Sequence, residues 1–217
     1  MREHFDLELQ SLENHFLEMA QEVLKNGSKT LLAMMTYDQQ LASILVDDDK
    51  RINDYQIAIE IACANVLALQ QPMVSDLRLV LAIMASSSDL ERMADHFAGI
   101  AKSITRLKEV ERSPLFEERL QEMGQDALRM LEDMIRIFPA HTSSSAKELA
   151  KQDESLDQAY WYLSKEMISQ MKQQDVHIPN GTEYLAILHH IERFGDYIAN
   201  ICERLVYLET GELVELN

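Results

Sequence analysis

Four pairs of oxygen-bearing side chains stand four residues apart in this sequence. On an α-helix this spacing places both members of a pair on the same face, one turn apart. Carboxylate and amide oxygens are the ligands that Mg²⁺, Mn²⁺ and iron prefer, whereas Zn²⁺ favours nitrogen and sulfur. We therefore treat the following residues as candidate metal ligands: Asp49 with Asn53, Glu91 with Asp95, Asp153 with Asp157, and Glu192 with Asp196.

The heights of these pairs along the expected helices distinguish them from an ordinary acidic surface. The chain has 37 Asp and Glu residues, so a single such pair is more simply a solvated helix face. However, an antiparallel hairpin turning at Pro72 would bring Asn53 and Glu91 to one height, because each is 19 residues from the turn. Residues 157 and 192 are likewise symmetric about position 174.5. Each half of the chain is expected to gather four oxygen ligands at one level.

Long helices are the elements that would position these ligands. Apolar residues recur at steps of three and four, the spacing typical of one helix face, within the ranges 5–34, 41–69, 79–104, 116–134, 149–171 and 187–208. Only 6 Gly and 4 Pro interrupt the chain, which leaves little material for the turns of a β-rich fold. The sequence therefore predicts an all-α protein with six long helices.

An internal repeat divides these helices into two units. Residues 90–104, LERMADHFAGIAKSI, align with residues 191–205, IERFGDYIANICERL, at an offset of 101, and the pair at 49 and 53 aligns with that at 153 and 157 at an offset of 104. Ser113 followed by Pro114 is typical of a new helix start. We expect two tandem three-helix bundles, covering residues 1–111 and 112–217.

Charge and composition limit the partners of the chain. The formal net charge of −17 argues against binding to nucleic acid or directly to anionic membranes. The N-terminus lacks the apolar core of a secretion signal, and no apolar stretch is long enough to span a bilayer. Cys63 and Cys202 are interpreted as buried thiols in a reducing compartment. We expect a cytoplasmic protein without membrane insertion.

Sequence motifs of several enzyme classes are missing. The chain has no Glu-x-x-His, no His-Glu-x-x-His, no glycine-rich phosphate loop and no serine nucleophile elbow. His96 and His189 lie close enough to the acids to contribute to a metal site, but a hydrogen-bonded or exposed helix histidine is the simpler interpretation. We expect the chain not to be an enzyme.

The doubled acidic motif resembles that of the PhoU family of phosphate-uptake regulators. It stands here as Glu91-x-x-x-Asp95 and Glu192-x-x-x-Asp196, preceded by Asp49-x-x-x-Asn53 and Asp153-x-x-x-Asp157 respectively, and it is supported by QQPMVSDLR at 70–78 and ERLVYLETGE at 203–212. The resemblance covers essentially the whole chain. One departure is Asn53, which stands where the second half has Asp157, so the first site is expected to be less negative.

This resemblance implies two three-helix bundles related by a pseudo-twofold axis, with metal ions of the Fe, Mn, Mg or Zn type in multinuclear clusters on the acidic motifs. It also implies a negative regulator of the phosphate-starvation response. Such a regulator would work between the nucleotide-binding subunit of the phosphate ABC transporter and a phosphate-sensing histidine kinase of the two-component type. Contact with these partners would bring it to the inner face of the membrane, and we expect a homodimer.

Two alternatives stay open at the level of the sequence. The same acids could be the ligands of a metal-dependent, carboxylate-bridged enzyme, either an oxidase or a phosphohydrolase. They could also be the solvated face of a purely structural bundle, in which case replacing Glu91 and Asp95 would change neither metal content nor phosphate regulation. Metal analysis and partner binding separate these hypotheses.

Overall fold

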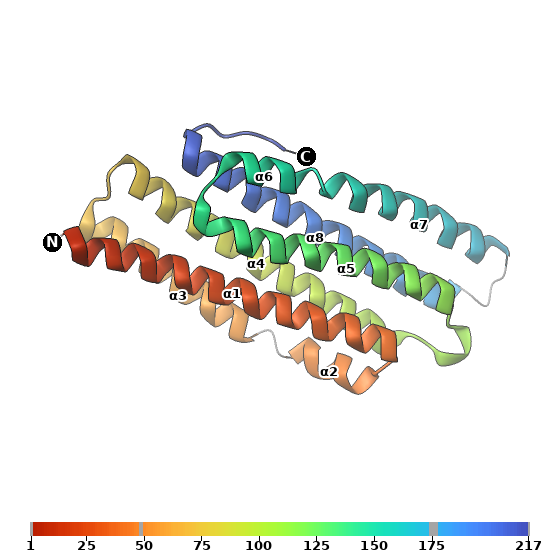
Figure 1. The fold of residues 1–217 in the computed structure, drawn as a ribbon. Helices are drawn as coiled ribbons and strands as arrows, with labels where there is room; N and C mark the ends of the chain where they lie inside the picture. Colours follow the sequence, from red (N-terminus) through yellow and green to blue (C-terminus); the bar gives the residue numbers. More distant parts are fainter. Residues whose placement is uncertain (1, 48–49, 174–177, 217) are drawn as a thin grey trace.

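The computed structural model describes residues 2–47, 50–173 and 178–216, and it is helical almost throughout (Figure 1). No strand occurs among these residues, so the all-α prediction is confirmed. Two short 3₁₀ helices, Glu109–Glu111 and Phe138–Ala140, lie in connections. The α-helices are α1 (Arg2–Thr36), α2 (Gln39–Asp47), α3 (Lys50–Gln70), α4 (Val74–Arg106), α5 (Pro114–Ile137), α6 (Ser143–Ala150), α7 (Asp153–Gln173) and α8 (Ile178–Thr210).

The prediction of one continuous fifth helix is wrong, because the chain turns between α6 and α7. The Gln152 backbone N–H donates to the Leu149 carbonyl (3.0 Å) and the Ser155 N–H donates to the Gln152 carbonyl (3.1 Å), which are tight i to i+3 bonds. Both helices pack on α8, so the apolar spacing continues through the turn and conceals it. In the first half, α2 and α3 lie on either side of residues 48–49, and the candidate ligand Asp49 lies outside the described residues.

The long helices lie side by side and give an elongated molecule with α4 and α8 at its centre (Figure 1). Each helix of the first half has a counterpart in the second, and α1 packs on α5 as α4 packs on α8. The Phe97 and Phe194 rings, 4.7 Å apart between centroids, join α4 to α8, and the Phe16 and Phe138 rings are 4.4 Å apart. The two bundles therefore share a continuous apolar core.

The connection between the halves is held by α8. The Asn180 side chain forms two 2.8 Å hydrogen bonds with the backbone of Lys108, accepting from its N–H and donating to its carbonyl. Pro114 is the first residue of α5, as predicted, and Ser113 stands at the N-cap. The predicted boundary between the two bundles, at 111/112, falls within this connection, and the boundary stays a prediction.

An ion pair with a buried carboxylate closes this connection. The Arg112 guanidinium donates from Nε to both carboxylate oxygens of Glu117, at 3.0 and 3.1 Å. The Tyr184 hydroxyl donates to Glu117 Oε1 and accepts from the Ser113 N–H at 3.2 Å. Burial, and then the hydrogen bond to Glu117, raise the pKa of Tyr184. The residues Arg112, Ser113, Glu117 and Tyr184 are called the linker clasp below.

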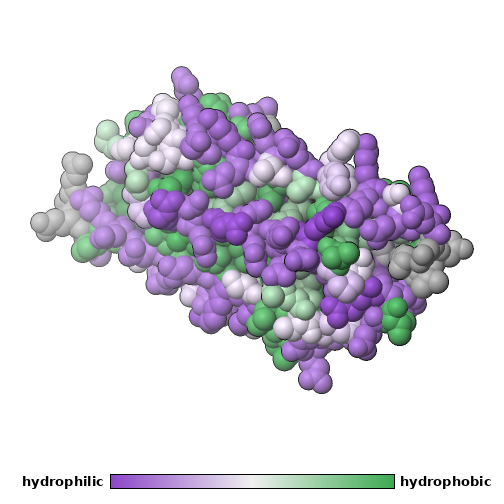
Figure 2. Space-filling view, turned by 45° about the vertical axis from the view of Figure 1, so that its right-hand side comes forward, coloured by the Kyte–Doolittle hydropathy of each residue, from purple (hydrophilic) through white to green (hydrophobic). Residues whose placement is uncertain are grey.

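Figure 2 shows one face on which hydrophilic side chains dominate and hydrophobic residues are visible between them. Within the described part of the chain, no helix combines the length and the apolar character needed to cross a bilayer. Most of the long helices instead bury one apolar side in the shared core.

Candidate metal centre

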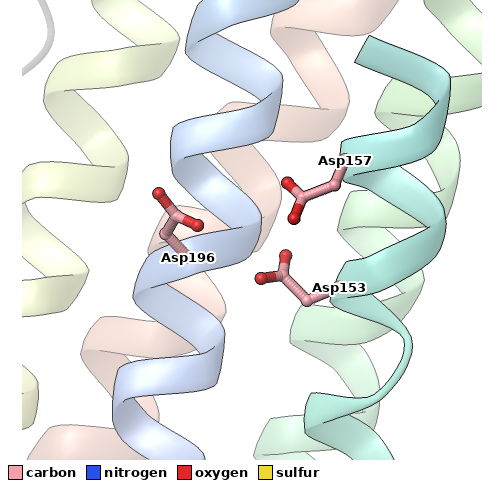
Figure 3. A group of neighbouring side chains, drawn as sticks. All are labelled: Asp153, Asp157 and Asp196. Carbon is pink, nitrogen blue, oxygen red and sulfur yellow. The ribbon is translucent and has the colours of Figure 1, made fainter. Parts of the chain in front are cut away.

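Three of the predicted ligands meet between α7 and α8. Asp153 and Asp157 project from successive turns of α7, and Asp196 faces them from α8 (Figure 3). One carboxylate oxygen from each lies within 4.8 Å of the others. The i, i+4 spacing on α7 therefore presents both side chains to the neighbouring helix, as the sequence predicted for this half of the chain.

Gly195 allows this approach. A Cβ atom at this position would collide with Asp153 Oδ1 and would lie 2.7 Å from Leu156 Cδ1, so a larger residue fits only if these side chains move aside. Asp153 itself is only 2% exposed. It lies in the first turn of α7, where the positive end of the helix dipole favours a carboxylate. The turn between α6 and α7 thus places a buried acid at a helix start.

Glu192 is the fourth acid of this group, one turn before Asp196 on α8. Its Oε2 atom is buried and has no hydrogen-bond partner, and His189 Nδ1 lies 3.6 Å from it. Burial, followed by repulsion from Asp196 and, more weakly, from Asp157, raises the pKa of Glu192, while His189 and Arg193 oppose this. Glu192 therefore lies within electrostatic reach of Asp196 and Asp157.

The ionisation of Asp196 is opposed in the same way. Burial raises the pKa of Asp196, Asp157 raises it further, and Arg193 opposes the shift through an ion pair with Asp196 Oδ2. A group of acids whose ionisation is opposed by burial and by each other attracts a cation strongly. Arg193 supplies only part of the missing charge.

The donor set fits a hard or borderline metal ion. Metal–oxygen distances in proteins are about 2.0–2.6 Å, so two oxygens on opposite sides of one ion lie roughly 4–5 Å apart. One oxygen each of Asp153, Asp157 and Asp196 lie within 4.8 Å of one another, close enough for one ion to reach all three. These residues could hold a metal ion, and Glu192 could complete the set with its buried oxygen.

In the first half, the candidate ligand Asp49 lies outside the described residues. As predicted, α3 and α4 form a hairpin that turns at residues 71–73. Asn53 Oδ1 is buried without a hydrogen-bond partner, Glu91 is half-buried and Asp95 is exposed. Among the described residues, the acids of this half form no group of three like that of the second half. The first four-ligand site stays a prediction.

The sequence did not predict two features near α4 and α8. Burial raises the pKa of Asp89 to about 6, although the nearby Arg204 opposes the shift. His96 and His190 lie in direct contact, with 2.8 Å between their Nδ1 atoms. In the sequence, the only sign of this histidine contact is Gly99, which stands three residues after His96 and therefore lies on the same face of α4 as His96.

Comparison with known proteins agrees with the repeat and the fold. The PhoU domain matches residues 16–104 and again residues 120–205. A phosphate-specific transport system accessory protein PhoU homolog from Streptococcus pneumoniae serotype 4 is 57% identical over 217 residues, which is 100% of both chains. The accessory protein PhoU of Escherichia coli K12 is 30% identical over 208 residues, covering 96% of this chain and 86% of its own.

A solved structure is similar as well. The crystal structure of the phosphate transport system regulatory protein PhoU from Streptococcus pneumoniae superimposes with a TM-score of 0.93 at 55% identity, covering 98% of this chain and 100% of the other. The prediction of two tandem three-helix bundles related by an internal repeat is confirmed.

Proposed function

This chain belongs to the PhoU family, and from that premise we propose that it is an accessory regulator of phosphate transport. The observation that carries the proposal is the end-to-end match, at 57% identity, to a relative named as a phosphate-specific transport system accessory protein. The acidic motifs and the hairpins that position them belong to the matched segments, 16–104 and 120–205.

The finer proposal is that the chain is a non-enzymatic adaptor that restrains the phosphate-starvation response. It contacts the nucleotide-binding subunit of the phosphate ABC transporter and the cytoplasmic region of a phosphate-sensing histidine kinase, and it acts as a homodimer in the cytoplasm. Its position at the inner face of the membrane depends on these partners. A metal ion at Asp153, Asp157, Glu192 and Asp196 neutralises the acids and shapes the surface between α7 and α8.

Exposed apolar side chains support a role in protein contact. Trp161 on α7 is 60% exposed and Tyr162 beside it is equally exposed. Ile57, which stands at the equivalent position of α3 at an offset of 104, is 53% exposed, and Ile61 one turn later is exposed too. Large apolar residues at matching places in both halves are more typical of interaction sites than of free surface.

Deletion of the chain tests the regulatory role. In phosphate-rich medium, cells lacking it should express phosphate-starvation genes and take up phosphate without restraint, and the wild-type chain should restore control. Pull-down with the transporter's nucleotide-binding subunit and with the kinase's cytoplasmic region should recover both partners. Unchanged starvation-gene expression in the deletion strain, together with failure of both pull-downs, would contradict the proposal.

Metal analysis tests the role of the acids. Replacing Asp157 and Asp196 by Asn removes two ligands, and we expect metal affinity to fall by about 100-fold or more. Glu118 and Glu122 are exposed acids four residues apart on α5, so a double Gln variant there changes the net charge equally and is the matched control. Equal metal content in both double variants would count against the site.

The alternative hypothesis of a metal-dependent enzyme is tested with the same two double variants. Purified protein loaded with Fe, Mn or Mg is assayed for oxygen consumption and for phosphate-ester hydrolysis. Turnover that disappears in the Asp157 and Asp196 variant but persists in the control would replace the adaptor proposal with a carboxylate-bridged enzyme. We expect no turnover above the background of the free metal ion.

A further inference from the structure

Large apolar side chains are exposed at the turn between α3 and α4, which lies at one end of the molecule (Figure 1). They are Leu69, Met73, Val74 and Leu77, and the first two are each 76% exposed. Single exposed apolar residues are normal on a protein surface, whereas a group of them is typical of a contact site. We call these four residues the apolar tip.

One residue of the apolar tip, Met73, stands where a polar residue would stabilise the protein more. It is the N-cap of α4, and its side chain makes no capping hydrogen bond. Ser, Thr, Asp and Asn are preferred at this position because their side-chain oxygens accept hydrogen bonds from the free N–H groups of the first turn. Met73 therefore neither caps α4 nor enters the core. A residue that breaks a local rule without a gain in packing is expected at a functional site.

The turn holds the apolar tip in a defined position. Gln71 has a φ of 47°, in the left-handed region that is uncommon for residues other than glycine, and Pro72 fixes its own φ. The Gln70 side-chain amide donates a 3.0 Å hydrogen bond to Glu8 Oε2, which ties the end of α3 to α1. A surface that is ordered before binding loses little conformational entropy when a partner binds.

A mainly apolar pocket opens beside the apolar tip, between α1 and α3. Its volume is about 240 Å³, and Leu69 belongs both to the tip and to the pocket wall. Leu12, Ala62 and Val66 supply more of the apolar wall. The Glu8 carboxylate lines the same pocket. The pocket therefore fits an apolar side chain whose neighbour in the partner carries a positive charge.

The charge of this end of the molecule selects the kind of partner. Glu8 lines the pocket, and Asp76 lies in the first turn of α4. Arg78 is turned toward the Tyr207 ring of α8, 5.9 Å from its centroid. Because the whole chain carries a formal charge of −17, an anionic membrane would repel it, and a second copy would bring the same acids together. A basic protein segment with apolar side chains complements both the apolar tip and the acids.

We propose that the apolar tip and the pocket beside it bind a basic, amphipathic segment next to a membrane span of the phosphate-sensing histidine kinase. This inference rests on the proposed function, in which that kinase is a partner. Cytoplasmic segments that flank membrane spans carry an excess of Lys and Arg, whereas the transporter's nucleotide-binding subunit does not span the membrane. The apolar residues of the kinase segment cover the tip and enter the pocket, and its cations pair with Glu8 and Asp76.

Isothermal titration of the full-length chain with the kinase's cytoplasmic region, including the segment next to its membrane span, tests the proposal. Leu69→Gln and Met73→Ser should each weaken binding at least tenfold. Met73→Ser places a preferred capping residue at the start of α4, so its lower affinity cannot be explained by unfolding. Val110→Ser is the matched control, because it removes an exposed apolar side chain beyond the far end of α4, and it should bind like the wild type.

The outcomes separate this inference from the proposed function. If the wild type binds the kinase region and both tip variants bind it equally well, the docking surface is wrong while the kinase contact stands. If the wild type does not bind the kinase region, both the contact and the docking surface are wrong. Flotation with anionic vesicles and sedimentation of the chain alone test the other occupants. If either is altered by the tip variants while kinase binding is not, the surface belongs to the membrane or to a second copy.

Discussion

Gly195→Ala is the sharpest perturbation of the acid group, because it adds one methyl group at its closest contact. The new Cβ would collide with Asp153 Oδ1 and press on Leu156 Cδ1. To reach ordinary van der Waals contact the carboxylate must withdraw by about 1 Å. Overpacking of this kind lowers the free energy of unfolding by about 1–3 kcal/mol, whereas replacing Gly by Ala inside a helix raises it by about 1 kcal/mol. The net loss of stability should be about 0–2 kcal/mol.

The effect on metal binding should exceed the effect on stability. A shift of about 1 Å breaks the spacing of the three carboxylates, so we expect metal affinity to fall by tenfold or more. Gly181→Ala is the matched control on the same helix, about 21 Å away at 1.5 Å per residue. Its Cβ would meet the flexible side chain of Met171, which can move aside, so stability should change by no more than about 1 kcal/mol.

Urea unfolding and isothermal titration with Mn²⁺ measure the two quantities on the same samples. The explanation predicts that Gly195→Ala loses metal affinity while Gly181→Ala retains it, although both add one methyl group to α8. If both variants bind Mn²⁺ like the wild type, the contact between Gly195 and Asp153 does not set the geometry of the site. If both lose binding equally, the effect is a general one on α8.

The remaining predictions concern the linker clasp and the first half. Tyr184→Phe leaves the Ser113 N–H without its acceptor and should cost about 1–3 kcal/mol in urea unfolding, while Tyr162→Phe at an exposed site should cost almost nothing. Folding raises the pKa of Tyr184, so the unfolded phenol loses its proton at a lower pH than the folded one. The free energy of unfolding of the wild type should therefore fall as pH rises above about 10. In Tyr184→Phe this fall should be less steep. Asn53→Asp, measured in a background with Asp157→Asn, should raise metal affinity roughly tenfold by titration.

The helices could be predicted from the sequence because apolar spacing persists through each of them. The turn at residues 151–152 could not, because α6 and α7 both pack on α8 and keep the same apolar side inward. The linker clasp was also hidden, since Glu117 and Tyr184 are 67 positions apart and an acid in a helix is usually taken as surface. Patterns within a helix are visible in a sequence, whereas contacts between distant helices are not.

The second-half acids could be predicted because two local patterns coincide there. The i, i+4 spacing puts Asp153 and Asp157 on one side of α7, and Gly195 beside Asp196 permits that side to come close. The contact between His96 and His190 had no such pattern, because it crosses 94 positions and joins the two halves. A histidine pair of this kind becomes evident only when the interface of α4 and α8 is known.

The duplication supplies two similar scaffolds but not two identical sites. At an offset of 101, Ala94 stands at the position of Gly195, and its side chain is buried. In the second half a Cβ at this position would collide with Asp153 Oδ1, so we expect the first half to hold its neighbouring helices further apart. Asn53 also replaces a carboxylate with an amide. The smaller negative charge and the wider spacing of the ligands both weaken metal binding. The first site should therefore bind metal less tightly than the second.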